Sequence, residues 1–248
     1  MKNPFGNPAS RRDFAYCPPK APCIELLHDS HVAVVVKPPG LLSVPGRAPE
    51  ACDSALFRVR KAHPQAQAVH RLDMDTSGIL AIALTREAAS ALGRQFQERT
   101  VRKLYLAWVD GEVLEGGAVD APLRCDWENR PRQMVDRRLG KRALTLYLPL
   151  LRKTGRTLVA LEPLTGRSHQ LRVHMALKGH PILGDRFYAH SEAAAASQRL
   201  MLHASFLEFE HPHTKIRQAF RSLPDFAQEL GEVPDPSIMG SLLPPGLL

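Results

Sequence analysis

The sequence has few cysteines and no long apolar run. Only four cysteines occur among 248 residues, none in CxxC spacing, which favours reduced thiols over a disulfide framework. The longest apolar runs, residues 32–36 and 79–84, have the length of core strands and are too short to cross a bilayer. No charged start followed by an apolar stretch opens the chain, so no secretory signal is predicted. We therefore expect a cytoplasmic protein that does not enter a membrane.

Acidic residues are in the minority. The 33 lysines and arginines exceed the 25 acidic residues, giving a net charge of +8. Such a surplus favours a polyanionic partner, because each phosphate that is neutralised releases condensed counterions. Basic side chains gather in residues 128–143, either as a solvated loop or as a finger along a phosphate backbone, which we favour. The candidate phosphate-binding residues there are Arg130, Arg132, Arg137, Arg138, Lys141 and Arg142.

The chain alternates between strand-like and helix-like segments. Strands are predicted over 24–36 (two strands and a turn), 79–84, 103–113 and 144–164 (a hairpin). Helices are predicted over 54–63, 85–100 and 168–179. In 103–113 the alternation around Tyr105 indicates a half-buried strand, and Thr85 is a plausible helix cap. Because strands outnumber helices, we predict an α+β fold: a mixed, largely antiparallel sheet with helices packed on it.

No linker separates independent domains. We predict a flexible basic leader over residues 1–22, one folded domain over 23–230 and a loose, proline-rich tail over 231–248. The leader is too short to form a separate RNA-binding domain of the S4 type.

Residues 70–78, HRLDMDTSG, precede an apolar strand and carry the most informative chemistry. Ser77 and Gly78 are predicted to turn the chain into that strand and to leave Asp73 at the edge of a cleft. A carboxylate attacks well only when it is ionised and removed from water, which requires a fixed cation close by. Arg71 and Arg167 are candidates for that cation. On spacing alone, a turn-forming Asp73 and a surface Arg167 remain the alternative interpretation.

Three other kinds of site fit the sequence less well. Residues 73–78 match the opening of an EF-hand loop, but position twelve is Leu84 instead of a bidentate glutamate. Eleven histidines occur without an HExxH motif or paired cysteines, so no metal site is predicted. Ser168 and His169 are adjacent, but neighbouring side chains on a helix point apart and no GxSxG elbow is present.

Four segments together resemble the signature motifs of RluA-type pseudouridine synthases. They are residues 34–46, 70–84, 102–111 and 161–189, and the resemblance extends over about residues 24–226. The family implies a pseudouridine synthase fold, with the sheet split into two lobes around a central RNA-binding cleft. Segments 44–50, 124–133 and 183–189 resemble the branch that acts on both 23S ribosomal RNA and the tRNA anticodon stem-loop.

The resemblance also implies roles for individual residues. Asp73 would be the catalytic aspartate, held by a salt bridge from Arg167. Tyr105 would stack on the target uracil and Leu171 would pack against the base. Arg71 would enter the RNA as the uridine leaves the stack. Asp75, the second acid of the segment, has no catalytic counterpart.

The implied reaction isomerises uridine to pseudouridine, breaking the bond from ribose C1′ to N1 and joining C1′ to C5. No atom is gained or lost, so we expect no cofactor and no metal. The target base must be flipped out of its stack. Two routes stay open for Asp73: attack on C1′, or removal of a sugar proton. We expect a monomer. The alternatives from other classes are a noncatalytic RNA-binding or ribosome-assembly protein on the same fold and a metal-dependent hydrolase.

Overall fold

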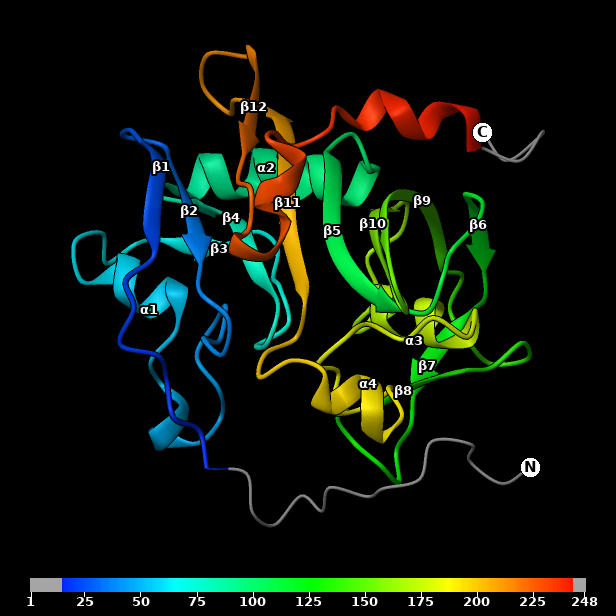
Figure 1. Ribbon diagram of the computed structural model, residues 1–248. Coiled ribbons are helices and arrows are strands. Elements are labelled where there is room, and N and C mark those ends of the chain that lie inside the picture. Colours follow the sequence, from blue (N-terminus) through cyan, green and yellow to red (C-terminus); the bar gives the residue numbers. More distant parts are fainter. Residues whose placement is uncertain (1–14, 243–248) are drawn as a thin grey trace. The chain divides into compact units, whose positions relative to one another are not determined.

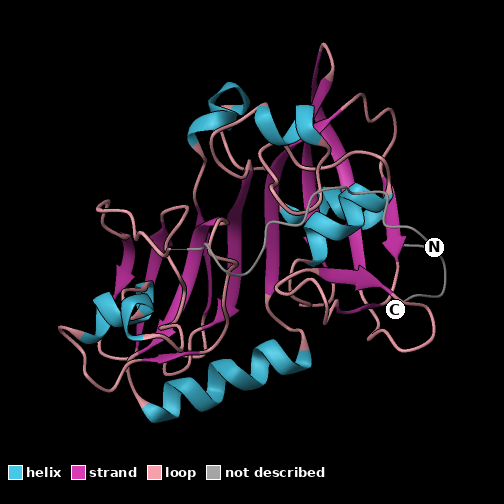
Figure 2. Ribbon diagram, turned by 90° about the horizontal axis from the view of Figure 1, so that it is seen from below, coloured by secondary structure: helices cyan, strands magenta, loops and turns pink. Residues whose placement is uncertain are grey.

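The computed structural model describes residues 15–242, which divide into two compact units (Figure 1). Unit 2 consists of Tyr16–Lys103 and His203–Val233. Unit 1 consists of Leu104–Leu202 and the described residues after 233. Strands make up most of the regular structure, as the view by secondary structure shows (Figure 2). Within the described residues, no helix is both long and apolar enough to cross a membrane.

The sheet of unit 2 has the order β1 (Ile24–His28), β2 (Val32–Lys37), β4 (Ser77–Ala83) and β11 (Leu202–Glu210). Two further strands pair with its members, β3 (Gln67–Ala68) with β4 and β12 (Arg217–Arg221) with β11. Only the pair of β4 and β11 is parallel among these. Every residue of β4 is buried, because both of its faces and both of its edges are covered, as its continuous apolar run predicts.

Helix α2 (Arg86–Glu98) covers one face of this sheet. Thr85 caps it as predicted, since its Oγ1 accepts a 3.1 Å hydrogen bond from the amide of Ala88. Ala88 and Leu92 join the apolar core formed by β2, β4 and β11. The predicted helix at 54–63 is the shorter α1 (Ala55–Arg60), capped by Ser54. Two 3-10 helices, η1 (Pro49–Ala51) and η2 (Asp225–Leu230), complete this unit.

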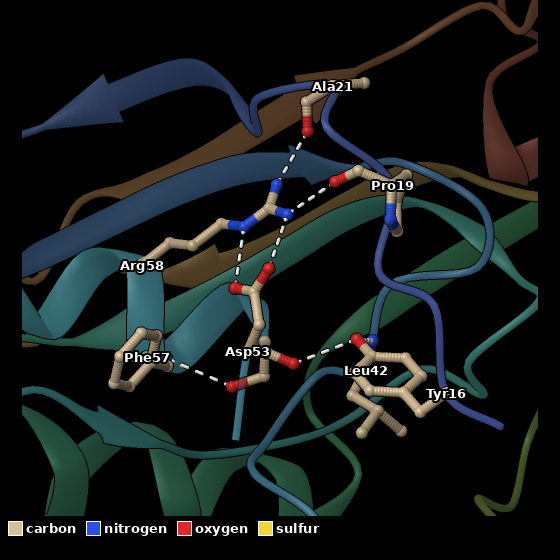
Figure 3. Close-up of polar contacts among 8 residues, drawn as sticks. Tyr16, Pro19, Ala21, Leu42, Asp53, Phe57 and Arg58 are labelled. Carbon is tan, nitrogen blue, oxygen red and sulfur yellow. Dashed lines mark hydrogen bonds and ion pairs between the residues drawn. The ribbon is translucent and has the colours of Figure 1, made fainter. Parts of the chain in front are cut away.

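The described part of the predicted leader is attached to unit 2 (Figure 3). Tyr16 donates its hydroxyl hydrogen to the main-chain oxygen of Asp53 at 2.9 Å. Arg58, which forms an ion pair with Asp53, donates to the main-chain oxygens of Pro19 and Ala21 at 2.6 Å each. Residues 16, 19 and 21 of the predicted leader therefore have partners in unit 2, while the flexibility of the leader stays a prediction. Residues 1–14 lie outside the described part.

Unit 1 contains an antiparallel sheet in the order β5 (Arg102–Asp110), β10 (Arg156–Pro163), β9 (Leu144–Lys153) and β6 (Gly117–Asp120). The predicted hairpin of β9 and β10 is confirmed, with a turn at Gly155 in the left-handed region (φ +71°). The half-burial predicted for β5 is wrong. Ala107 and Val109 belong to the main core of the unit, and on the other face Lys153 and Arg156 lie over the ring of Trp108.

Helix α3 (Gln170–Leu177) is buried along all but its last residue, and Gly179 follows it at φ +83°, as a helix stop requires. A short helix, α4 (Ser191–Ala195), lies further along the chain. The described part of the predicted tail contains the 3-10 helix η3 (Pro236–Leu242), in which Met239 is fully buried. Residues 243–248 are outside the described part.

The basic stretch predicted to be a loop contains a strand. Strand β8 (Gln133–Val135) pairs antiparallel with β7 (Leu123–Cys125), and the two form a separate hairpin. Strand β8 also has a partner outside this hairpin. The amide of Gln133 donates a 2.8 Å hydrogen bond to the hydroxyl of Tyr188. We refer to Leu123–Val135 as the basic hairpin. The predicted mixed, largely antiparallel sheet with few helices is confirmed.

Candidate active site

The segment with Asp73 is tied down on both sides of the aspartate. The hydroxyl of Ser43 donates to the main-chain oxygen of Leu72 at 2.8 Å and accepts from its amide at 3.0 Å. On the other side, the amide of Thr76 donates to the main-chain oxygen of Asp73 at 3.2 Å, which closes a turn. Asp73 is partly buried and Arg71 is exposed. The backbone of the aspartate is therefore fixed by residues 43 and 76, both in unit 2.

Lys37 is the second anchor of this segment. It is fully buried, and its Nζ donates to the main-chain oxygens of Pro38, Leu41 and Met74 at 3.0, 2.7 and 2.9 Å. A buried ammonium group is tolerated only when its donors find acceptors, and these three carbonyls provide them. Lys37 thus connects the segment 34–46 with the segment 70–84. The sequence analysis assigned Lys37 no role. A lysine at the end of a buried apolar strand nevertheless indicates a buried ammonium group that needs acceptors.

Gly78 was predicted to turn the chain into β4. That prediction is wrong, because Gly78 lies inside the strand. Its φ is +119°, and a Cβ atom there would lie 2.4 Å from the amide nitrogen and carbonyl oxygen of Ala204. Only glycine permits this close approach of the parallel strand β11. Next to it, Ser77 hydrogen-bonds to His203 at 2.8 Å, and His203 also contacts Ser222 at 3.0 Å. Residues 77 and 78 therefore hold β4 against β11.

His70 opens the same segment and is held neutral. Its Nε2 accepts a 2.9 Å hydrogen bond from the amide of Ala81, and its ring stacks on Phe96 at 4.4 Å between centroids. Burial, with the nearby charge of Lys103, lowers the pKa of His70 to about 3. The neutral imidazole therefore serves as a hydrogen-bond acceptor for the strand β4.

In unit 1, Tyr105 and Leu171 meet in one apolar cluster. Leu171, 6% exposed, is a member of the core formed by β5, β10 and α3, and the partly exposed Tyr105 packs against it. Tyr105 stands opposite Leu161 in the pairing of β5 with β10. A partly exposed phenol over an apolar floor is a suitable surface for a flat base.

Arg167 lies in the turn before α3 and is partly buried. Its amide donates to Oε1 of Gln170 at 3.1 Å, and its Nε donates to the main-chain oxygen of Arg142 at 3.1 Å. The turn is completed by His169, which is in the left-handed region at φ 53°. The guanidinium therefore has a defined direction at the start of α3, where the sequence predicted it.

A buried polar network that sequence reasoning missed supports this turn. Gln170 accepts from the hydroxyl of Thr165 at 2.7 Å and donates to Oγ1 of Thr145 at 3.0 Å. His174 also contacts Thr145 Oγ1, at 2.9 Å, and burial lowers its pKa. All four side chains are buried. The helical position of Gln170 was predicted, but its partner Thr145 comes from β9, 25 residues away in sequence.

The start of α3 is also linked to the basic hairpin. Arg172 and Asp185 form a buried bidentate ion pair at 2.7 Å for both contacts. Burial alone would raise the pKa of Asp185, but Arg172 and two main-chain amides outweigh it and lower that pKa. The adjacent Tyr188 hydroxyl contacts Nδ1 of His169 at 2.6 Å and accepts from the amide of Gln133 in the hairpin. Tyr188 thus connects the helix start to β8.

The six predicted RNA-binding residues of the basic stretch lie in and after the basic hairpin. Arg137, Arg138, Lys141 and Arg142 are exposed, while Arg130 and Arg132 are partly exposed. The carboxylate of Asp136 accepts hydrogen bonds from the amides of Leu139 and Arg138 and from the side chain of Arg124. These donors lower the pKa of Asp136 to about 2. The exposed charges of this stretch are therefore mainly positive.

The predicted site residues fall into two groups. Asp73 and Arg71 belong to unit 2; Arg167, Tyr105, Leu171 and the basic residues belong to unit 1. The predicted salt bridge between Asp73 and Arg167 stays a prediction. Within residues 15–242 no group of three or more histidine, cysteine, aspartate or glutamate side chains is arranged to hold a metal ion.

Comparisons with known proteins identify the class. The family model described as RNA pseudouridylate synthase matches residues 31–177. A "Dual-specificity RNA pseudouridine synthase RluA" of Yersinia pestis is 52% identical over 82% of this chain and 100% of its own length. The protein of that name in Escherichia coli K12 is 50% identical over 85% of this chain and 98% of its own. The chain belongs to the RNA pseudouridylate synthase family, and it is an enzyme of that class.

A solved structure agrees with the fold. "Human RNA Pseudouridylate Synthase Domain Containing 1" has a TM-score of 0.72 at 27% identity, over 91% of this chain and 96% of that chain. The predicted pseudouridine synthase fold is therefore confirmed, and the alternative of a metal-dependent hydrolase is wrong.

Proposed function

We propose that this chain isomerises uridines in two RNA classes, 23S ribosomal RNA and the tRNA anticodon stem-loop. The observation that carries the proposal is 52% identity over the full length of a relative named as a dual-specificity enzyme. The segments 44–50, 124–133 and 183–189, which resemble the dual-specificity branch, support it. The mainly positive surface of the basic stretch fits a phosphate backbone of either class.

Asp73 is the catalytic residue in this proposal. Arg167 pairs with its carboxylate, while Tyr105 stacks on the flipped uracil and Leu171 packs against it. The anchors at Ser43, Lys37 and Thr76 support this role, because a fixed backbone presents the carboxylate in one position. Flipping costs roughly a few kcal/mol, and one aromatic stack returns about 1–3 kcal/mol.

Arg71 and the exposed basic residues hold the RNA. Arg71 is exposed two residues before Asp73, so it can enter the space that the flipped uridine leaves. Arg130, Arg132, Arg137, Arg138, Lys141 and Arg142 contact phosphates. The reaction needs no cofactor or metal, since it only rearranges bonds within the nucleotide. We further propose a monomer that works in the cytoplasm, where its RNA substrates are.

Mapping pseudouridines in total RNA from cells with and without this chain tests the proposal. The expected result is the loss of at least one site in 23S ribosomal RNA and one in a tRNA anticodon stem-loop. Loss of sites in only one RNA class would reduce the proposal to a single-specificity enzyme. If no site were lost in either class, the proposed pair of RNA substrates would be wrong.

A further inference from the structure

The tip of the basic hairpin exposes a tryptophan. Trp127 lies two residues after the end of β7, just before the turn, and is 64% exposed, whereas the other tryptophan, Trp108, is 4% exposed. Indole is the largest apolar side chain, and its amphipathic ring favours contact surfaces over open solvent. None of the roles assigned above uses this residue.

Hydrogen bonds close the turn that follows Trp127. Asp126 accepts from the amide of Asn129 at 3.3 Å and from its Nδ2 at 2.9 Å. Backbone hydrogen bonds between Asp126 and Arg132 and between Arg132 and Asn129 are both 3.0 Å. These bonds hold the backbone that carries the indole, which lowers the entropy that must be offset when a ligand binds.

A cation covers part of the ring. The guanidinium carbon of Arg130 lies 4.4 Å from the centroid of Trp127, and its Nε donates to the main-chain oxygen of Trp127 at 3.3 Å. An apolar protein partner would have to bury this guanidinium without a counter-charge, which is costly. A nucleotide satisfies both groups, because its base stacks on the indole and its phosphate pairs with the guanidinium.

The surrounding charge points to the same ligand. From residue 121 to 143 the chain has seven basic residues (Arg124, Arg130, Arg132, Arg137, Arg138, Lys141, Arg142) and three acidic ones (Asp126, Glu128, Asp136). Asp126 and Asp136 are engaged in the local turns, so Glu128 is the one acid of this stretch without such a structural role. The indole stands in a positive field, which attracts a polyanion.

We propose that Trp127 is a stacking platform for an unpaired base of the RNA substrate, a different base from the uridine that is isomerised. Arg130 binds the phosphate next to that base. The inference rests on the proposed function, since it needs an RNA with a single-stranded loop. It adds a recognition contact on unit 1 that selects RNAs by an unstacked base, independent of the chemistry at Asp73.

Binding to a tRNA anticodon stem-loop transcript and to a 23S hairpin transcript tests the proposal. Trp127→Ala is expected to raise the Kd by about 5- to 150-fold, which corresponds to the loss of one base–aromatic stack. Trp127→Phe is expected to raise the Kd by less. Leu114→Ala, which removes an apolar side chain 67% exposed in the same unit, is the matched control and is expected to bind like the wild type. Trp127→Ala should leave the slope of log Kd against log salt unchanged, whereas Arg130→Gln should reduce it by about 1.

Tryptophan fluorescence gives a second readout. Either transcript should quench the emission of the wild-type chain, and Trp127→Phe should lose that response. Unchanged Kd in Trp127→Ala, or quenching that persists in Trp127→Phe, would overturn the proposal. A shift in oligomeric state on Trp127→Ala with unchanged RNA binding would assign the ring to a protein contact and overturn it equally.

Pseudouridine formation in total RNA, measured in parallel, separates this inference from the proposed function. If the wild type and Trp127→Ala isomerise uridines with the same KM, the stacking contact is absent and the proposed function stands. If the wild type isomerises no uridine, the proposed function fails, and the binding titration alone decides the stacking contact.

Discussion

The buried ammonium of Lys37 donates a 2.9 Å hydrogen bond to the main-chain oxygen of Met74, the residue after Asp73. The same oxygen accepts from the amide of Gly40 at 2.9 Å. A residue 37 positions away in sequence therefore sets the backbone next to the proposed catalytic aspartate, and it does so within unit 2 alone.

Replacing Lys37 with methionine should remove this anchor while keeping a long apolar side chain. Three carbonyl oxygens would lose a donor, at a cost of about 1–3 kcal/mol for each that stays unsatisfied, so we expect a loss of at least about 2 kcal/mol in the free energy of unfolding. The activity of the folded variant should fall through kcat more than through KM. Urea unfolding and steady-state kinetics measure both effects. The exposed Lys61→Met is the control, and equal effects of the two changes would contradict the role of Lys37.

Asp73→Asn should abolish pseudouridine formation while leaving RNA binding nearly unchanged. The amide keeps the size of the side chain but removes the charge that either chemical route requires, so we expect a loss of at least about 1000-fold in kcat. Release of tritium from RNA labelled at C5 of uridine reports the reaction, because that carbon forms the new bond.

Asp75→Asn is the matched control for this change, since Asp75 is an acid of the same segment without an assigned catalytic role. It should stay within a few-fold of the wild type. An Asp73→Asn variant as active as Asp75→Asn would show that the carboxylate of residue 73 is not the reacting group.

Arg167→Lys should lower kcat by at least about ten-fold with little change in RNA affinity. A lysine keeps the charge but has no planar fork to pair with a carboxylate, and it has no Nε–H for the main-chain oxygen of Arg142. Single-turnover kinetics and RNA titrations separate the two quantities. Arg156→Lys, at the first residue of β10, serves as the control. Full activity of Arg167→Lys would mean that its charge alone suffices.

The stability of the protein should fall on acidification between pH 6.5 and about 3, in part because of His70. Its pKa is lowered to about 3 in the folded state, so over this range the unfolded chain takes up a proton that the folded chain does not. The contribution of a single group is at most about 1.4 kcal/mol per pH unit. Urea unfolding at several pH values should show a shallower dependence for His70→Gln, whose side-chain oxygen can still accept from Ala81. Parallel curves for both proteins would remove His70 as the cause.

Several elements could be predicted because their signals are local. Thr85 marks the start of α2, since a hydroxyl that accepts from the third following amide depends on neighbouring residues only. Gly155 and Gly179 mark a turn and a helix stop for the same reason. The apolar run in β4 predicts a strand covered on both faces, which the structure confirms.

Other features depended on chain segments that are distant in sequence. Gly78 is required because a Cβ atom at this position would lie 2.4 Å from the backbone of Ala204. The residues 70–84 alone do not predict that Ala204 is the neighbour. On the second face of β5, Lys153 and Arg156 lie over Trp108, far from it in sequence. In the described part of the tail, Met239 is buried.

By itself, the sequence determined part of the strands and helices, among them β4, the hairpin of β9 and β10, and α2, together with the motifs that identify the enzyme class, because periodicity, capping and motif spacing depend on short stretches of chain. Only the tertiary structure decided which groups fix those motifs: Lys37 and Ser43 around Asp73, and the network of Gln170 next to Arg167. The physical reason is that a buried polar group must find its partner wherever the fold brings one, and hydrogen bonds do not depend on distance along the chain.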